Sequence, residues 1–272
     1  MIPGTTLSEF QPWRSILKTL AFIFSMLCMA AVAGAEVRLD PVEYKQGDTT
    51  LRGWIAYDTA AKDKRPGVIV VHEWWGLNDY SKMRAKMLAE AGYVAFAADM
   101  YGDGKVTEHP QEAGEWSGAF AKNKEMAAAR FHAALAQFKA DSHVDPEHIA
   151  AIGYCFGGSV VLGMAMDGAD LDGVASFHGG LPVDPASGKV TASILVCHGA
   201  ADAFATPEQI QTFQKNLADA GADFEFISYG NAKHSFTNPG ADKHGIPGLA
   251  YNEKADKRSW QTLLGFLSEV TK

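Results

Sequence analysis

The sequence predicts an α/β fold, with a mostly parallel central sheet and helices on both faces. Short apolar segments alternate with helical segments along residues 36–272, and glycine or polar residues follow most of the predicted strands. The composition, 47% hydrophobic and 21% charged, is that of a globular domain with a large core. We therefore expect one domain over residues 36–272.

The predicted elements begin with a hairpin and continue as strand–helix units. In chain order, we expect strands at residues 37–45, 50–57, 68–71, 93–97, 149–154, 173–177, 193–198 and 223–229, and helices at about 79–92, 123–140, 158–166, 207–220 and 252–269. Gly47-Asp48 is typical of the turn of a hairpin. Asn78 or Asp79 can cap the first helix. Thr206 as a cap, with Pro207 at the first helical position, favours a helix start there.

The remaining assignments rest on the spacing of apolar residues. Residues 68–71 and 93–97 are unbroken apolar runs, as in parallel strands that are buried on both faces. Residues 123–140 carry Ala, Phe and Leu at spacings of three and four, and residues 252–269 are amphipathic. Ligands of such sheets bind at the carboxyl ends of the strands. The loops at those ends are therefore where we look for function.

Residues 153–158, Gly-Tyr-Cys-Phe-Gly-Gly, are typical of a sharp strand-to-helix turn. Glycines two residues before and two after Cys155 leave room for a strained backbone at that position. A side chain held on such a turn stands clear of the sheet, and a thiol there is a candidate nucleophile. The alternative is that Cys155 is a small apolar residue in a tight turn.

Two further residues complete a candidate triad. Asp202 follows the strand at 193–198 and His234 follows the strand at 223–229, so all three residues are expected at one edge of the sheet. The order nucleophile, acid, histidine is that of α/β-hydrolases. Cys155 would attack, His234 would transfer the proton and Asp202 would orient the imidazole. Taken singly, Asp202 could be a helix cap and His234 a surface histidine.

The segment after the strand at 68–71 is expected to contribute to an oxyanion hole. In this fold one backbone N–H comes from that loop and the other from the residue after the nucleophile, here Trp74 and Phe156. Glu73 would lie beside the nucleophile, unless it pairs with a nearby basic residue. Trp74 and Trp75 would wall an apolar pocket, although aromatic residues at a strand end are also ordinary core.

With these motifs the chain resembles the dienelactone hydrolase family over nearly all of residues 40–270. The matching segments are His72-Glu73-x-x-Gly76-Leu77, Ala98-Asp99-Met100-Tyr101, Gly153-Tyr154-Cys155-Phe156-Gly157-Gly158, His198-Gly199-x-x-Asp202, His234-x-Phe236 and Tyr251…Trp260…Phe266. The resemblance implies an α/β-hydrolase fold with a Cys155–His234–Asp202 triad. It also implies that the Glu73 carboxylate meets the thiol and helps to deprotonate it when substrate arrives. The implied reaction is attack on an ester or lactone carbonyl, a thioester acyl-enzyme and hydrolysis by water, with no metal or organic cofactor.

The chain departs from the family where the substrate carboxylate is held. The dienelactone enzymes place one arginine after the Asp-Leu-Tyr segment and one after the catalytic His segment. Here Gly102-Asp103-Gly104 and Thr237-Asn238 occupy those places, and Lys105 is expected to be exposed. Dienelactone is therefore not the substrate that we expect. Residues 101–122 are expected to form a lid that sets specificity, and the candidate pocket residues are Trp75, Tyr101, Phe236 and Asn238.

The first 35 residues have the pattern of a secretory signal. Arg14 and Lys18 precede the apolar run at 20–32, and Ala33-Gly34-Ala35 is a small-x-small cleavage pattern. The run is shorter than a membrane span requires, so we predict cleavage after Ala35 rather than an uncleaved anchor. The residues before Cys28 match a lipidation signal poorly. We expect a periplasmic or secreted enzyme that meets the membrane only during export.

The net charge and the cysteine content exclude some classes of partner and of function. A net charge of −8 with no basic block argues against nucleic-acid binding. The partner that we expect is a small-molecule substrate. We also expect a monomer. Cys155 and Cys197 remain after cleavage, and their expected places in or beside buried strands argue against a disulfide. The absence of a C-x-x-C motif argues against a thiol redox protein. A hydrolase-fold binding protein that has lost catalysis is the other alternative, and the intact candidate residues argue against it.

Overall fold

The computed structural model describes Met1 and residues 36–272, so the predicted cleavage after Ala35 lies outside the described residues. The strands are β1 (Val37–Gln46), β2 (Thr49–Asp58), β3 (Arg65–Val71), β4 (Val94–Ala98), β5 (Val144–Tyr154), β6 (Gly173–Phe177), β7 (Ser193–Gly199) and β8 (Phe224–Tyr229). The helices are α2 (Asp79–Glu90), α3 (Pro110–Lys122), α4 (Lys124–Lys139), α5 (Phe156–Met166), α6 (Pro207–Asp219), the short 3-10 helix η1 (Ala241–His244) and α7 (Glu253–Val270).

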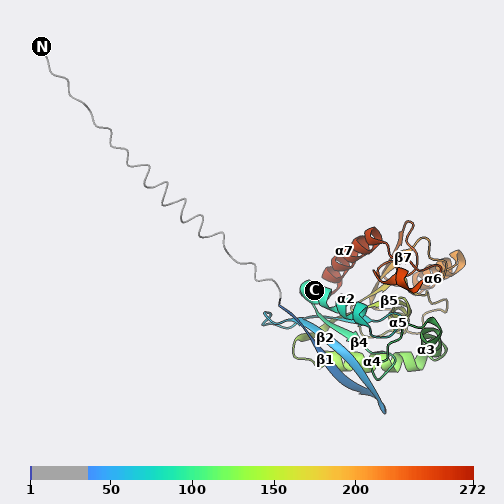
Figure 1. Cartoon of the computed structure of the whole chain (residues 1–272), viewed down its shortest axis with the longest axis horizontal. Coiled ribbons are helices and arrows are strands. Elements are labelled where there is room, and N and C mark those ends of the chain that lie inside the picture. Colours follow the sequence, from blue (N-terminus) through green and yellow to red (C-terminus); the bar gives the residue numbers. More distant parts are fainter. Residues whose placement is uncertain (2–35) are drawn as a thin grey trace. The chain divides into compact units, whose positions relative to one another are not determined.

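All eight described strands belong to one sheet, in the order β1-β2-β4-β3-β5-β6-β7-β8 (Figure 1). β1 and β2 form the predicted antiparallel hairpin, and β2 pairs antiparallel with β4. The other neighbouring pairs, from β4 to β8, are parallel. The predicted α/β fold with a mostly parallel sheet is therefore confirmed.

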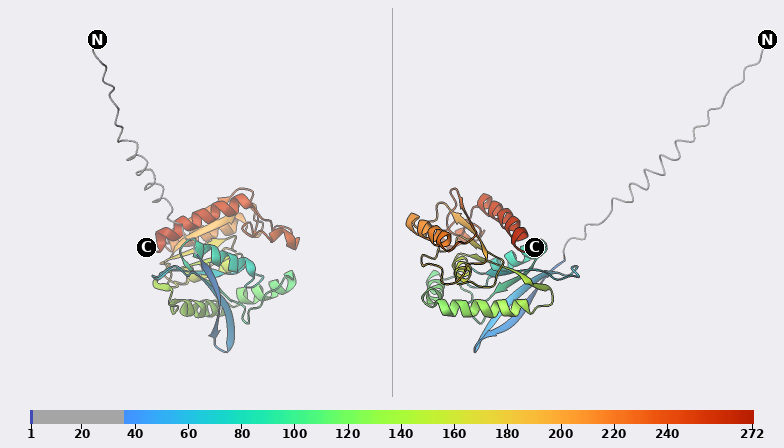
Figure 2. Two further views of the ribbon diagram at one scale, coloured as in Figure 1. Left: turned by 60° about the vertical axis from the view of Figure 1, so that its left-hand side comes forward. Right: turned by 180° about the vertical axis from the view of Figure 1, so that it is seen from behind.

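Two apolar clusters lie on opposite faces of this sheet. Because successive side chains of a strand point to opposite faces, Ile69 of β3 packs in one cluster and its neighbour Val68 in the other. The Ile69 cluster includes residues of α4, α5 and α6, and the Val68 cluster includes residues of α2 and α7. Figure 2 shows α7 (red) and α4 (green) on opposite sides of the sheet. The predicted covering of both faces by helices is thus present.

Several elements differ from the predicted bounds, among them β3, which begins at Arg65 rather than at residue 68. β5 begins at Val144 rather than at residue 149. Val144 and Asp145 already pair with β3, and the regular pairing continues from Ile149 after an irregularity that includes Pro146. α5 begins directly after the cysteine, at Phe156 rather than at Gly158. Helix α3 lies within residues 101–122, where we predicted only a lid; Gly114 and Gly118 lower the helical propensity of this segment. α3 nevertheless forms, with buried Ala113 and Phe120 holding one side.

Candidate active site

Cys155 occupies a strained turn between β5 and α5. Its φ of 53° and ψ of −115° are rarely adopted by residues that carry a side chain. The turn is tight: a Cβ added at Gly153 would lie 2.1 Å from the Gly157 carbonyl oxygen, and one added at Gly157 would lie 2.3 Å from the Val71 carbonyl oxygen. Both glycines are therefore required by space. The turn leaves Cys155 only partly buried.

His234 is hydrogen-bonded to Asp202 and lies near Cys155. Its Nδ1 lies 2.8 Å from Oδ2 of Asp202, and the two side chains are 11% and 2% exposed. Burial opposes charging of the ring, but the nearby Cys155 sulfur and the hydrogen bond with Asp202 outweigh it and raise the pKa of His234 to about 10. Burial acts against the Asp202 carboxylate too, yet its bond with His234 holds its pKa below the ordinary value. The structure thus brings together the three residues that the sequence analysis selected.

The raised pKa of His234 predicts a pH-dependent contribution to stability. The folded protein holds this proton more tightly than the unfolded chain, so its stabilisation is complete below the ordinary pKa of 6.5 and is lost as the pH rises towards about 10. We expect the difference in unfolding free energy between the wild type and His234→Gln to shrink over that interval, as measured by urea unfolding. In a Cys155→Ala background the interval should contract, because one source of the raised pKa is gone. A difference that is independent of pH would contradict this assignment.

The backbone N–H groups of Trp74 and Phe156 have no acceptor among the described residues. Among residues 36–272, neither the Trp74 N–H nor the Phe156 N–H donates to another residue, and the first N–H of a helix has no acceptor within that helix. The Tyr101 hydroxyl donates to the Trp74 carbonyl over 3.0 Å, and the Gly157 N–H donates to the His72 carbonyl over 3.1 Å. The first bond ties the loop after β3 to the segment after β4, and the second ties it to the start of α5. The two predicted oxyanion-hole donors are therefore available to a ligand.

Glu73 is buried beside this site and is held by neutral donors. Its side chain accepts from the Ser235 hydroxyl at 2.9 Å and from the Asn238 amide at 2.5 Å, and the residue is 1% exposed. Burial raises the pKa of Glu73, while the bonds from Asn238 and Ser235 and the charge of His234 oppose that rise. Among the described residues the carboxylate forms no salt bridge and no hydrogen bond to Cys155. The alternative of an ion pair with a basic residue is therefore not realised.

The four candidate pocket residues lie in different environments. Tyr101 packs its ring 5.3 Å from that of Phe156, and Asn238 is engaged with Glu73. Trp75 is 2% exposed and stacks on His244 at 4.0 Å, and Phe236 is 0% exposed. Stacking and packing hold the Trp75 and Phe236 rings in the core, and the assignment of all four residues to a substrate pocket stays a prediction.

Sequence reasoning missed two residues that adjoin the triad. His178 follows β6 and accepts a hydrogen bond from the Cys155 N–H at its Nδ1, over 3.1 Å. Phe204 is 57% exposed, and its ring lies edge-on 5.0 Å from the His234 ring. The signal for His178 was present, since a polar residue directly after a strand is the same feature that selected Asp202. Phe204 carries no such signal.

The two cysteines of the described chain are free thiols. Cys197 lies within β7 with 0% exposure, and burial raises its pKa to about 12. A thiol that stays protonated and inaccessible is a poor nucleophile. Cys155 is therefore the reactive candidate of the two.

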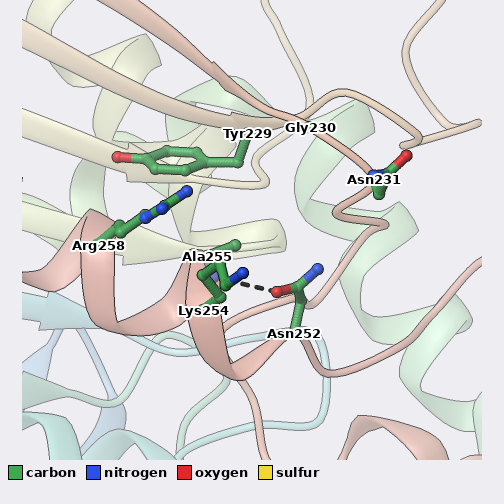
Figure 3. A pocket seen from close by; sticks show the side chains of 7 residues that line it. All are labelled: Tyr229, Gly230, Asn231, Asn252, Lys254, Ala255 and Arg258. Atoms are coloured by element: carbon green, nitrogen blue, oxygen red, sulfur yellow. Dashed lines mark hydrogen bonds between the residues drawn. The ribbon is translucent and has the colours of Figure 1, made fainter.

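A separate hollow of about 210 Å³ lies where the end of β8 meets the start of α7 (Figure 3). Its lining residues are Tyr229, Gly230, Asn231, Asn252, Lys254, Ala255 and Arg258. Asn252 already serves α7 as its cap, accepting from the Ala255 N–H at 3.1 Å. None of the predicted site residues lines this hollow.

Two general features of the described chain bear on cofactors and membranes. From residue 36 onward, no group of three or more His, Cys, Asp or Glu side chains is arranged to hold a metal ion. Over the same residues, no helix has both the length and the apolar character that crossing a membrane requires.

Comparison with known proteins places the chain in a family. Residues 51–271 match the model of the dienelactone hydrolase family. A putative carboxymethylenebutenolidase of Aquifex aeolicus is 25% identical over 240 residues, covering 85% of this chain and 98% of the relative. The crystal structure of a dienelactone hydrolase-like promiscuous phosphotriesterase from metagenomic libraries is 38% identical, with a TM-score of 0.85, covering 88% of this chain and all of that one (100%). The chain therefore belongs to the dienelactone hydrolase family of α/β-hydrolases.

Proposed function

We propose that the protein hydrolyses uncharged carboxylic esters or lactones through a thioester on Cys155. The observation that carries the proposal is the alignment of a partly exposed thiol, an imidazole with a raised pKa and a buried carboxylate at one edge of the sheet. The Trp74 and Phe156 N–H groups, which have no acceptor among the described residues, support it. Nucleophile, proton carrier, orienting acid and oxyanion donors are the parts that acyl transfer requires.

In the acylation step the Cys155 sulfur, whose proton has passed to His234, attacks the carbonyl carbon of the substrate. The carbonyl oxygen becomes an oxyanion that the Trp74 and Phe156 N–H groups bind. Expulsion of the alcohol breaks the ester C–O bond, and the leaving oxygen takes the proton from the His234 imidazolium. Asp202 keeps the ring oriented and stabilises its charged form. The product of this step is a thioester on Cys155.

In the deacylation step a water molecule replaces the alcohol. His234 accepts a proton from the water as its oxygen attacks the thioester carbonyl, and the same two N–H groups bind the second oxyanion. Collapse breaks the C–S bond, releases the carboxylic acid and returns the proton to the sulfur. Glu73 is proposed to assist deprotonation of the thiol after leaving Ser235 and Asn238, since its carboxylate is bonded to both in this structure.

The charges around the site favour an uncharged substrate. Asn238 lies where the family places an arginine, and its amide is bound to the buried Glu73 carboxylate. Arg84 is buried and bonded to Asp256, so its charge is already paired. A substrate carboxylate would lie near the Glu73 carboxylate without the arginines that the family places there, which disfavours an anionic lactone.

A second candidate reaction is the hydrolysis of phosphotriesters. These compounds are also uncharged, and their phosphoryl oxygen would use the same two N–H donors as an ester carbonyl. The specific observation in favour is the 38% identity with the promiscuous phosphotriesterase, whose whole length this chain matches. An activity of this kind would use Cys155 as well, because this partly exposed thiol is the candidate nucleophile at the end of β5.

The proposed function is tested by trapping the acyl-enzyme. During turnover of p-nitrophenyl acetate we expect intact-mass spectra to show one added acetyl group, and peptide mapping to locate it on Cys155 rather than on Cys197. A neutral aryl lactone should be hydrolysed faster than the same lactone bearing a carboxylate. Paraoxon in the same panel tests the phosphotriester reaction.

Tight binding of panel members without turnover or adduct would instead support a binding protein with a lapsed hydrolase site.

We also propose that the chain is exported to the periplasm or secreted after cleavage of residues 1–35. The intact-mass spectra of protein from an exporting bacterium test this proposal, since the mature chain should begin at Glu36.

A further inference from the structure

His178 is bonded to the backbone of the nucleophile. The Cys155 N–H lies 3.1 Å from Nδ1 of His178 and 3.0 Å from the Phe177 carbonyl oxygen, so both residues at the end of β6 hold this peptide. His178 is 1% exposed and has a φ of 41°, in the left-handed region. A strained backbone persists only where its surroundings hold it. The two bonds from the end of β6 thus help to keep Cys155 in its unusual conformation.

The other ring nitrogen of His178 reaches the loop that carries His234. Nε2 lies 2.7 Å from the Thr237 hydroxyl oxygen, three positions after His234. Because Nδ1 accepts from the Cys155 N–H, the ring proton of the neutral tautomer is on Nε2 and is donated to Thr237. Burial, together with the charges of His234 and Arg84, lowers the pKa of His178 well below its ordinary value. A neutral ring with this tautomer can therefore bridge the two segments.

The Thr237 end of this bridge is itself anchored. The Tyr80 hydroxyl of α2 lies 2.6 Å from the Thr237 hydroxyl, and Arg84 donates to the Thr237 carbonyl oxygen over 2.6 Å. The same loop carries His234, and it carries the Ser235 and Asn238 side chains that hold Glu73. A shift of Thr237 relative to β6 would therefore move the imidazole relative to the thiol.

We propose that His178 is a positioning residue, whose imidazole sets the separation of the Cys155 thiol and the His234 imidazole by joining the Cys155 peptide to Thr237. The inference rests on the proposed function for the roles of Cys155 and His234. Displacement of a reacting group by about 1 Å can lower the rate by about 100-fold. The sequence gives no reason to link residues 178 and 237, which lie 59 positions apart.

Two variants break the bridge from opposite ends. His178→Asn tolerates the positive φ and keeps an acceptor near the position of Nδ1, but it is too short to reach Thr237. Thr237→Val keeps the shape of the side chain and removes its hydroxyl. We expect kcat for p-nitrophenyl acetate to fall about 10- to 100-fold in each variant. Because both changes break the same link, the double variant should fall no further than the poorer single variant.

A second readout requires no substrate. The pKa of His234, followed by NMR of its ring nitrogens, should fall in both single variants, since a looser site weakens its contact with Cys155. Tyr80→Phe is the control for the second hydrogen bond that Thr237→Val removes, and it should reduce kcat less than Thr237→Val does.

Losses of kcat that multiply in the double variant would overturn the proposal. Single variants with the kcat of the wild type and an unchanged His234 pKa would also overturn it. Equal ester turnover by the wild type and Cys155→Ala would instead remove the proposed function. The two failures are therefore distinguishable.

Discussion

Replacing Cys155 with alanine is expected to lower kcat/KM for p-nitrophenyl acetate by about 10⁴-fold or more. Alanine leaves the N–H donors of Trp74 and Phe156 and the His234–Asp202 pair in place, but it removes the atom that forms the thioester. Cys155→Ser should also lose most of the turnover, because a hydroxyl is a much weaker nucleophile than an ionised thiol. Initial rates corrected for spontaneous hydrolysis measure both effects.

Two controls separate the chemistry of Cys155 from its packing. Cys197→Ala changes the other described thiol, which lies in the core at 0% exposure, and should leave kcat/KM near the wild-type value. Cys155→Gly should be as inactive as Cys155→Ala but at least as stable, because glycine adopts a φ of 53° without steric cost. Retained ester turnover in Cys155→Ala, with the variant folded and the background subtracted, would remove the thioester mechanism.

Replacing Arg84 with methionine is expected to reduce the free energy of unfolding by about 3–5 kcal/mol. The Arg84 side chain is 2% exposed, and its guanidinium donates to Asp256 over 2.5 Å and to the Thr237 carbonyl oxygen over 2.6 Å. Methionine keeps the apolar stem but leaves a buried carboxylate and a carbonyl without their donor. Urea unfolding followed by fluorescence and by circular dichroism measures the loss.

The matched control for Arg84 is an exposed ion pair of the same protein. Lys257 bonds Glu253 on the surface of α7, with side chains 73% and 65% exposed, and Lys257→Met should change stability little. A double variant, Arg84→Met with Asp256→Leu, should recover part of the loss, because no buried charge is then left alone. An Arg84→Met protein as stable as the wild type would show that Arg84 and Asp256 contribute nothing net to folding.

Most of the fold was predictable because its signals are local. Apolar runs located the central strands, and the start of α6 at Thr206 and Pro207 was predicted correctly; the structure adds a capping box between Thr206 and Gln209. The glycines around Cys155 predicted the turn, since the space that they leave is a property of neighbouring backbone atoms. Helix α3 escaped prediction because tertiary contacts of Phe120 outweigh the low propensity of its glycines.

The sequence by itself determined the order of the candidate catalytic residues along the chain, the edge of the sheet that they share and the family of the chain. Only the tertiary structure decided which buried polar groups meet there: Glu73 with Asn238, 165 positions apart, and His178 with Cys155 and Thr237. The physical reason lies in the range of the forces involved. Strand periodicity and turn sterics act between chain neighbours, whereas the partner of a buried hydrogen-bonding group is chosen by side chains that distant segments bring within about 3 Å.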